Sequence, residues 1–253
     1  MGSLEDCHGK LCSILGTEIE PVEVFRIADQ YRRFWRPEKV RTILLAESHV
    51  HTSGEEATLT ITLPANITSL APRSFVRLVY CLGYGENELV YKPIIDPKNS
   101  GTWQFWQVFY SCLKQVTCNE DFAAIQKART PDLHQRIQNK LGLLEQLKQA
   151  GVWLVDGSLA ALYLPGRGKP QPVIRQQALE KSWDYYVGEQ IIEAKPEHII
   201  CIGNGVRNSL KSRLTEATSS CRITTVKQPN ARMSACERFQ NFKTYFEICS
   251  RLR

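Results

Sequence analysis

The sequence GVWLVDGSL at residues 151–159 places four apolar residues between a glycine and an aspartate. A short apolar run with such flanks is typical of a strand buried in a sheet. Upstream, apolar residues recur at helical spacing from Leu133 to Leu147, and Gly151 is the kind of residue that ends a helix. A long helix that leads straight into a buried strand predicts an α/β fold.

The same alternation continues on both sides of this stretch. Further apolar runs predict strands at 42–46, 75–80, 198–203 and 222–227. Helical spacing predicts helices at 24–34, near 103–110, and at 176–194, 206–215 and 239–252, and a Ser or Thr at 100–102 is suited to cap the second of these. Strands that alternate with helices indicate a sheet covered on both faces. We therefore expect an α/β, three-layer αβα fold with a central, mainly parallel sheet of about four strands.

Length and composition fit one domain. The chain has 253 residues, of which 43% are hydrophobic and 23% charged, as is ordinary for a globular protein. We expect a single domain over residues 1–253, with residues 1–20 as an N-terminal extension. No apolar run is long enough to span a membrane, and the start MGSLEDCHGK lacks the apolar core of a secretory signal. The prediction is a monomeric, cytoplasmic protein.

The nine cysteines are scattered, and no two of them have the spacing CxxC. Zinc sites and dithiol redox sites are therefore not expected. Free thiols in a reducing compartment are the simplest interpretation. We expect neither a metal nor a cofactor.

The net charge of +6 permits a polyanionic partner without requiring one. Arg167, Lys169 and Arg175 lie in a Gly/Pro-rich stretch, 165–177, that contains no acidic residue. Contact with phosphates is one interpretation of this stretch, and solvated surface is the other. A solvated helix face accounts for the second basic cluster, at residues 32–41.

In parallel α/β sheets, function collects at the carboxyl ends of the strands. Here those ends are 46–51, 156–158, 203–205 and 228–234. Gly203-Asn204-Gly205 is a weak dinucleotide-binding motif, because Asn208 stands at the third glycine position and the next strand ends without an acid. A tight turn is the better interpretation of these glycines.

Several of these segments, taken in order, resemble the uracil-DNA glycosylase superfamily. Residues 151–159 are similar to its G-V-L-L-L-N-x-x-L strand, Ser182-Trp183 to its Gly-Trp helix start, and 199–204 to its next strand and turn. Gln228-Pro-Asn-Ala-Arg-Met-Ser234 lies where the family carries H-P-S-P-L-S, and 45–51 occupies the place of its water-activating loop. The similarity is closest over residues 140–235 and looser over 40–115.

The resemblance implies a DNA glycosylase that flips one nucleotide out of DNA and hydrolyses its N-glycosidic bond. Glu47 falls on the catalytic glutamate of one branch of the family, and a carboxylate suits an oxocarbenium-like transition state. His51 falls on the loop histidine, and Ser48 and His49 lie beside it as candidate substrate contacts. Gln228 replaces the histidine that stabilises the departing base, and a glutamine amide can still donate a hydrogen bond. The structural alternative for Glu47 is a cap or a salt-bridge partner.

Asp156 stands where the family carries the asparagine that reads uracil. An ionised carboxylate cannot donate to O4 of uracil, but it accepts well from an exocyclic amine. We therefore expect a modified cytosine as the excised base, and some glycosylases of this kind act on hypermodified phage DNA in antiviral defence. The alternatives are a turn-capping role for Asp156, and a repair enzyme for uracil or another deaminated base.

The remaining expectations concern DNA, the expected partner. The resemblance implies that one aromatic ring stacks on the flipped base, and Tyr80 is favoured among Tyr80, Tyr84, Trp103, Phe105 and Trp106. Contacts with the DNA backbone are expected from Ser100, Thr102, Arg167, Lys169, Asn230 and Arg232. Some branches of the family hold an iron–sulfur cluster, but the spacings here do not resemble theirs, although four thiols are available at Cys7, Cys12, Cys112 and Cys118. The rival hypotheses are an inactive or covalent-trapping DNA binder, and a nucleotide- or nucleoside-processing enzyme on the same α/β plan.

Overall fold

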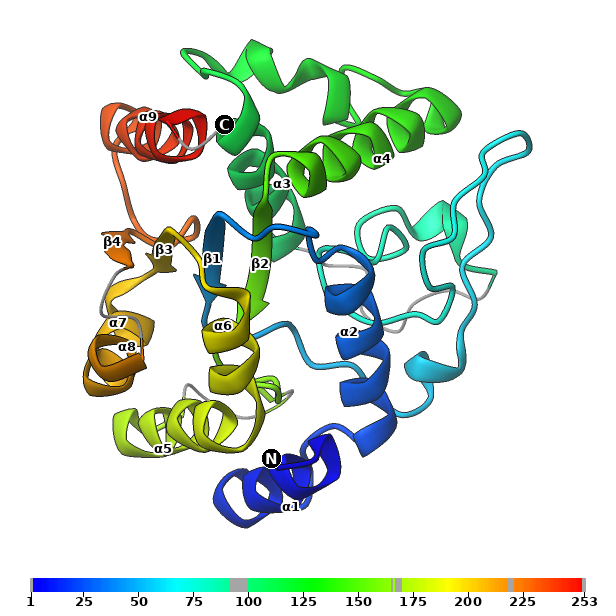
Figure 1. The fold of residues 1–253 in the computed structure, drawn as a ribbon. Coiled ribbons are helices and arrows are strands. Elements are labelled where there is room, and N and C mark those ends of the chain that lie inside the picture. The colour runs from blue at the N-terminus through cyan, green and yellow to red at the C-terminus, as the bar shows by residue number, and fades with distance from the viewer. Residues whose placement is uncertain (1, 92–99, 165, 167–169, 218–220, 252–253) are drawn as a thin grey trace.

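A computed structural model describes residues 2–91, 100–164, 166, 170–217 and 221–251. At its centre one sheet of four parallel strands has the order β2 (Val152–Asp156), β1 (Thr42–Ala46), β3 (His198–Ile202) and β4 (Arg222–Val226) (Figure 1). Each of these strands is one of the apolar runs expected from the sequence. The α/β class and the central parallel sheet are confirmed.

The strand side chains alternate between two hydrophobic cores. Leu44 and Leu154 belong to one core, whereas Leu45 and Val155 belong to the other. Successive residues of a strand point to opposite faces, so both faces of the sheet are buried. Every residue of β1, β2 and β3 is buried, as expected for parallel strands between two helical layers.

Two groups of helices cover the sheet and give the fold its three layers. The first group packs on the core that contains Leu44 and occupies the upper part of Figure 1: α3 (Ser100–Leu113), α4 (Leu133–Gln149) and α9 (Ala235–Arg251). The second group packs on the core that contains Leu45 and occupies the lower part: α1 (Leu4–Leu15), α5 (Pro172–Ser182), α6 (Gly188–Ala194), α7 (Asn204–Ser209) and α8 (Lys211–Ala217). Helix α2 (Val22–Phe34) packs beside β2 and contributes to both cores. The short helical segments are η1 (Glu56–Thr58), η2 (Asn87–Leu89), η3 (Asn119–Ile125) and η4 (Trp183–Val187).

The junction between α4 and β2 explains the glycine that precedes the decisive strand. Gly151 has a φ of +77°, and a Cβ there would lie 2.8 Å from the carbonyl oxygen of Lys39. A left-handed residue so close to another backbone segment has to be glycine. The expectation that a helix ends near Gly151 and a strand follows is confirmed.

The prediction of a strand at residues 75–80 is wrong. This segment is irregular, and the nearest β pairing among the described residues is an isolated bridge between Thr60 and Ser74. The apolar side chains of the segment are nevertheless buried in the same core as Leu44: Phe75, Val76, Leu78, Val79 and Tyr80. Burial alone therefore accounts for the apolar run, because a short run does not distinguish a strand from other buried chain.

Residues 2–20, expected as part of an N-terminal extension, pack against the rest of the domain. Ser3 caps α1 through a hydrogen bond from the backbone N–H of Asp6, and Cys7 and Leu11 are buried beside α5. Glu20, which follows α1, is also fully buried. This segment supplies part of the second core and, through Glu20, part of the site described below.

The helix expected at 176–194 is longer and is interrupted. It begins at Pro172, where the missing N–H of proline costs no intrahelical hydrogen bond, and it contains the π-helical segment η4. Within the described ranges no helix is both long and apolar enough to cross a membrane.

Candidate active site

Two adjoining cavities lie at the carboxyl ends of the strands. The larger, of about 160 Å³, is lined by Glu47 after β1, Gln228 after β4 and Tyr163 from the segment that follows β2. The smaller, of about 50 Å³, is lined by Asp156 at the end of β2. Both cavities share four lining residues: Ser48, His49, Val50 and Phe105. Because the register pairs Ala46 with Asp156, the carboxylates of Glu47 and Asp156 come from neighbouring strand ends.

The Glu47 carboxylate is buried but incompletely hydrogen-bonded. Its Oε2 accepts from the hydroxyl of Tyr163 at 2.9 Å and from the amide of Gln228 at 3.4 Å. Its Oε1 lies 3.5 Å from Nε of Arg175, yet neither Oε1 nor that Nε makes a hydrogen bond. Buried polar atoms are normally satisfied, and this oxygen belongs to a residue that lines a cavity, so a turn of the side chain toward the cavity would let water or substrate satisfy it.

Tyr163 is held in its donor state by this environment. Burial and the nearby Glu47 carboxylate raise the pKa of Tyr163 to about 12. The phenol therefore stays protonated near neutral pH and donates to Glu47. This contact fixes one carboxylate oxygen, whereas the other has no hydrogen-bond partner among the described residues.

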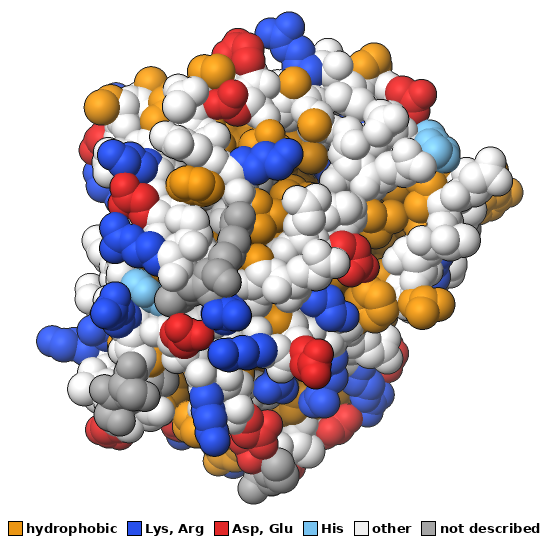
Figure 2. All heavy atoms as spheres, turned by 45° about the horizontal axis from the view of Figure 1, so that its top comes forward, with side chains coloured by type: hydrophobic (Ala, Val, Ile, Leu, Met, Phe, Trp, Pro, Cys, Tyr) orange, Lys and Arg blue, Asp and Glu red, His pale blue; other side chains and the backbone are white. Residues whose placement is uncertain are grey.

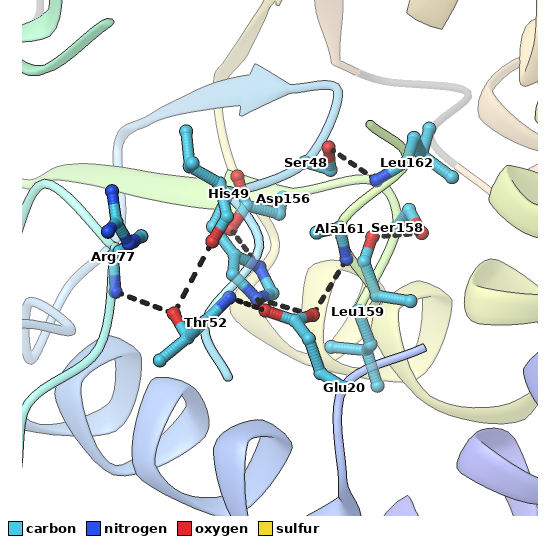
Figure 3. A network of polar contacts seen from close by, with 12 residues as sticks. Glu20, Ser48, His49, Thr52, Arg77, Asp156, Ser158, Leu159, Ala161 and Leu162 are labelled. Carbon is cyan, nitrogen blue, oxygen red and sulfur yellow. Dashed lines mark hydrogen bonds and ion pairs between the residues drawn. The ribbon is translucent and has the colours of Figure 1, made fainter. Parts of the chain in front are cut away.

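Asp156 lies in a buried network of alternating charges. Its Oδ2 accepts a hydrogen bond of 2.6 Å from Arg32 on α2 and lies 3.6 Å from Nδ1 of His49. The opposite ring nitrogen of His49, Nε2, lies 3.1 Å from the Glu20 carboxylate. Figure 3 shows His49 between Asp156 and Glu20. Two carboxylates and two cationic side chains thus form one buried cluster.

The charges of this cluster support one another. Burial opposes protonation of His49, but Glu20 and Asp156 outweigh it and raise the pKa of His49 to about 9. Burial likewise opposes ionisation of Asp156, and the charges of Arg32 and His49 overcome it, so that the pKa of Asp156 lies below its ordinary value. At neutral pH His49 is therefore a cation and Asp156 an anion.

Glu20 fastens three segments of chain around the site. Its carboxylate accepts from the backbone N–H of Thr52 at 2.7 Å and from that of Ala161 at 2.9 Å (Figure 3). The same carboxylate contacts His49. The loop after β1 and the segment after β2 are therefore held in place by one residue from the N-terminal region.

The turn after β3 makes room for Gln228. Gly203 has a φ of +104°, and a Cβ there would lie 2.6 Å from the side chain of Gln228. The glycine thereby allows Gln228 to reach Glu47. This close approach explains why residue 203 is a glycine, without any role in binding a dinucleotide.

The structure brings together part of the expected site. Glu47, Ser48, His49, Gln228 and Asn230 line the larger cavity, and Asp156 joins Ser48 and His49 at the smaller one. His51 is half-buried and is not among the described residues that line either cavity. Arg232 is exposed on the loop after β4. Arg167, Lys169 and the side chain of Ser100 lie outside what the structure describes.

Two expected contacts are wrong because the side chains are buried elsewhere. Tyr80 stacks on Trp35 and Phe109 in the core, and its hydroxyl accepts from the backbone N–H of Leu154 at 2.8 Å. Its ring therefore has no access to a flipped base. Thr102 is 3% exposed, too little for a contact with the DNA backbone. Phe105 is the aromatic residue that lines both cavities and replaces Tyr80 as the stacking candidate.

Sequence reasoning did not identify Glu20, Arg32, Tyr163 or the contact of Arg175 with Glu47 as parts of the site. Arg32 was assigned to a solvated helix face, but it is 2% exposed. One signal was available: Arg32 lies four residues after Ala28, on the buried side of α2. A charge on an apolar stripe indicates a buried partner. The pairings themselves join residues far apart in the chain, which local patterns do not show.

The thiols do not gather into a ligand set. Cys7 lies in the core that contains Leu45, whereas Cys112 lies in the core on the opposite face of the sheet. The four cysteines considered for a cluster therefore cannot share one. Among the described residues no group of three or more His, Cys, Asp or Glu side chains is placed to hold a metal ion.

No protein-family model matches the chain, and no curated protein matches it either.

Proposed function

We propose that this protein is a DNA glycosylase that hydrolyses the N-glycosidic bond of a modified cytosine. One observation carries the proposal: the buried carboxylates of Glu47 and Asp156 line adjoining cavities at neighbouring strand ends. One carboxylate has an unsatisfied oxygen, and the other is held by two cations. In this proposal Glu47 acts in bond cleavage and Asp156 recognises the base.

In the proposed mechanism Glu47 orients the attacking water. Tyr163 and Gln228 donate to Oε2, so Oε1 is the oxygen available to accept from water. Loss of the base leaves positive charge on the sugar, and a nearby carboxylate stabilises that charge. The base leaves with the electron pair of the broken N-glycosidic bond. As the water oxygen bonds to the sugar carbon, Glu47 takes up one proton of the water, and this proton then passes to the departed base.

Asp156 reads the base in this proposal. Both cationic partners contact Oδ2, and among the described residues Oδ1 accepts no hydrogen bond. An ionised carboxylate only accepts hydrogen bonds, so it favours the exocyclic amine of a cytosine-derived base over O4 of uracil. Phe105 lines both cavities and is placed to stack on the flipped ring.

Contact with DNA is assigned to the loops around the site. Asn230 lines the larger cavity, and Arg232 is exposed two residues later. On the face drawn in Figure 2, Lys and Arg side chains are interspersed with acidic ones and do not form one continuous basic band. Local contacts from the loop after β4 therefore support the proposal better than a broad electrostatic surface does.

The test is mass spectrometry of bases released from a panel of DNA that contains uracil, hypoxanthine or hypermodified cytosine. The proposal expects release of a cytosine-derived base by the wild-type protein and release about a hundredfold slower by Glu47→Gln. Binding without release from any of these substrates would contradict it. An adduct with DNA that survives denaturant would identify the covalent-trapping rival instead.

A further inference from the structure

A cavity of about 310 Å³ lies between the start of α3, the loop before η2 and the segment after η3. Its volume is at the lower end of the range for small-molecule sites. It is distinct from the candidate active site, although Thr102 lines both this cavity and the smaller active-site cavity.

Two buried polar atoms at this cavity have no hydrogen-bond partner among the residues that the structure describes. Oγ1 of Thr102 and Nε1 of Trp106 make no hydrogen bond, although the two residues are only 3% and 1% exposed. Leaving a buried donor unsatisfied costs roughly 1–3 kcal/mol. Both residues line the cavity, but the two atoms themselves are buried, so a ligand oxygen satisfies them only after their side chains turn toward the cavity.

Among the residues that the structure describes, one buried carboxylate beside the cavity is paired with two buried cations. Glu86 is paired with both Arg136, at 2.7 Å, and Lys140, at 2.5 Å. Lys127, which also lines the cavity, forms an ion pair with Glu88, so these two charges cancel. Burial lowers the pKa of Lys140 despite Glu86, which indicates that another anion nearby would be favourable. One carboxylate neutralises only one of the two buried cations.

The walls of the cavity suit a flat ring. Trp103 and Trp106 both line it, and the ammonium group of Lys140 lies 4.8 Å from the centre of the Trp106 ring. Aromatic walls with a few convergent polar groups are typical of small-molecule sites. We propose that this cavity binds a small aromatic oxyanion, in which a carboxylate or a phosphate monoester is attached to a flat ring.

The test follows the indole N–H signals in a ¹H–¹⁵N NMR spectrum during titration with benzoate, phenyl phosphate and neutral benzyl alcohol. The five tryptophans give one such signal each, and Trp106→Phe identifies that of Trp106. We expect a saturable shift of the Trp106 signal by at least one anion, with a Kd of about 1 mM or tighter. The Trp153 signal should not move, because its N–H already donates to the backbone oxygen of Arg32 at 2.9 Å. Whichever of benzoate and phenyl phosphate binds more tightly shows whether the cavity prefers a carboxylate or a phosphate.

Thr102→Val keeps the side-chain shape and removes the hydroxyl, so it should weaken the anion by about tenfold. Thr42→Val is the matched control, because Oγ1 of Thr42 is also buried and unpartnered but does not line the cavity. Lys140→Met should remove the preference for anions, and the other indole signals report whether it folds. If the Lys140→Met variant does not fold, the comparison of Thr102→Val with Thr42→Val tests the proposal instead. The proposal is overturned if neither anion shifts Trp106, if benzyl alcohol shifts it equally, or if the two threonine variants bind alike.

Discussion

Arg32 and Asp156 are separated by 124 residues in the chain, and the guanidinium of Arg32 donates a hydrogen bond of 2.6 Å to Oδ2 of Asp156. Their side chains are 2% and 3% exposed. The ion pair joins α2 to the end of β2 beside the smaller cavity. The carboxylate proposed to recognise the base is thus positioned by a residue from outside the sheet.

Arg32→Met should lower the free energy of unfolding by about 3 kcal/mol, because it leaves a buried carboxylate with one cationic partner fewer. Urea denaturation measures this change. Arg26→Met on the same helix is the control, since Arg26 pairs with Glu5 and Glu23 at the surface and should contribute less than about 1 kcal/mol. Equal losses in the free energy of unfolding for the two substitutions would show that the buried ion pair stabilises the fold no more than a surface pair does.

The cluster also predicts how stability depends on pH. The pKa of His49 is about 9 in the folded protein against an ordinary value of 6.5, because Glu20 and Asp156 outweigh the effect of burial. The folded state then binds the proton more tightly, so this contribution is complete below pH 6.5 and is lost as the pH rises through about 9. It amounts to roughly 3 kcal/mol. Urea denaturation from neutral to alkaline pH should show the loss in the wild type, and His49→Gln should flatten it; identical curves would refute the assignment.

The sequence predicted the four strands because strands buried on both faces are short apolar runs. The same pattern gave a wrong prediction at 75–80, where the apolar side chains are buried but the backbone is irregular. The positions of Glu47 and Asp156 were predictable, since both follow from strand ends that meet at one edge of a parallel sheet. Their partners were not: Glu20 lay in an expected extension, and the contacts of Arg32 and Tyr163 depend on tertiary packing across more than a hundred residues.

Glu47→Gln tests the catalytic carboxylate with little change in shape. Turnover should fall by about two orders of magnitude, as expected when a general base is removed, whereas DNA affinity should stay the same. Single-turnover kinetics and a binding isotherm separate the two effects. Wild-type turnover in this variant would remove Glu47 from the mechanism and leave it as a partner of Tyr163 and Arg175.

Arg232, with Arg167 and Lys169, is predicted to contact DNA phosphates. Replacing any one of them by Ala should weaken binding to every sequence and reduce the slope of log K against log salt by about one unit. Arg26→Ala is the control, because its guanidinium is already paired with Glu5 and Glu23. A slope unchanged in all three variants would mean that these residues do not contact phosphates.

Asp156→Asn converts an acceptor into a group that can also donate. Release of the cytosine-derived base should fall, and release of uracil should rise where the cavity holds uracil closely enough. The substitution also leaves Arg32 and His49 with one anion fewer, so the urea midpoint of the variant is measured alongside. Loss of the first activity in a variant that remains folded assigns recognition to Asp156.

The most direct measurement of the central claim is the identity of the base that the wild-type protein releases. Equal amounts of uracil-containing DNA and DNA with hypermodified cytosine are incubated with the protein, and the free bases are quantified by mass spectrometry. An ionised Asp156 beside the cavity predicts a cytosine-derived base and negligible uracil, since O4 of uracil would leave the buried carboxylate oxygen unpaired at a cost of roughly 1–3 kcal/mol. Robust release of uracil by the wild type would contradict the account and return Asp156 to a purely structural role.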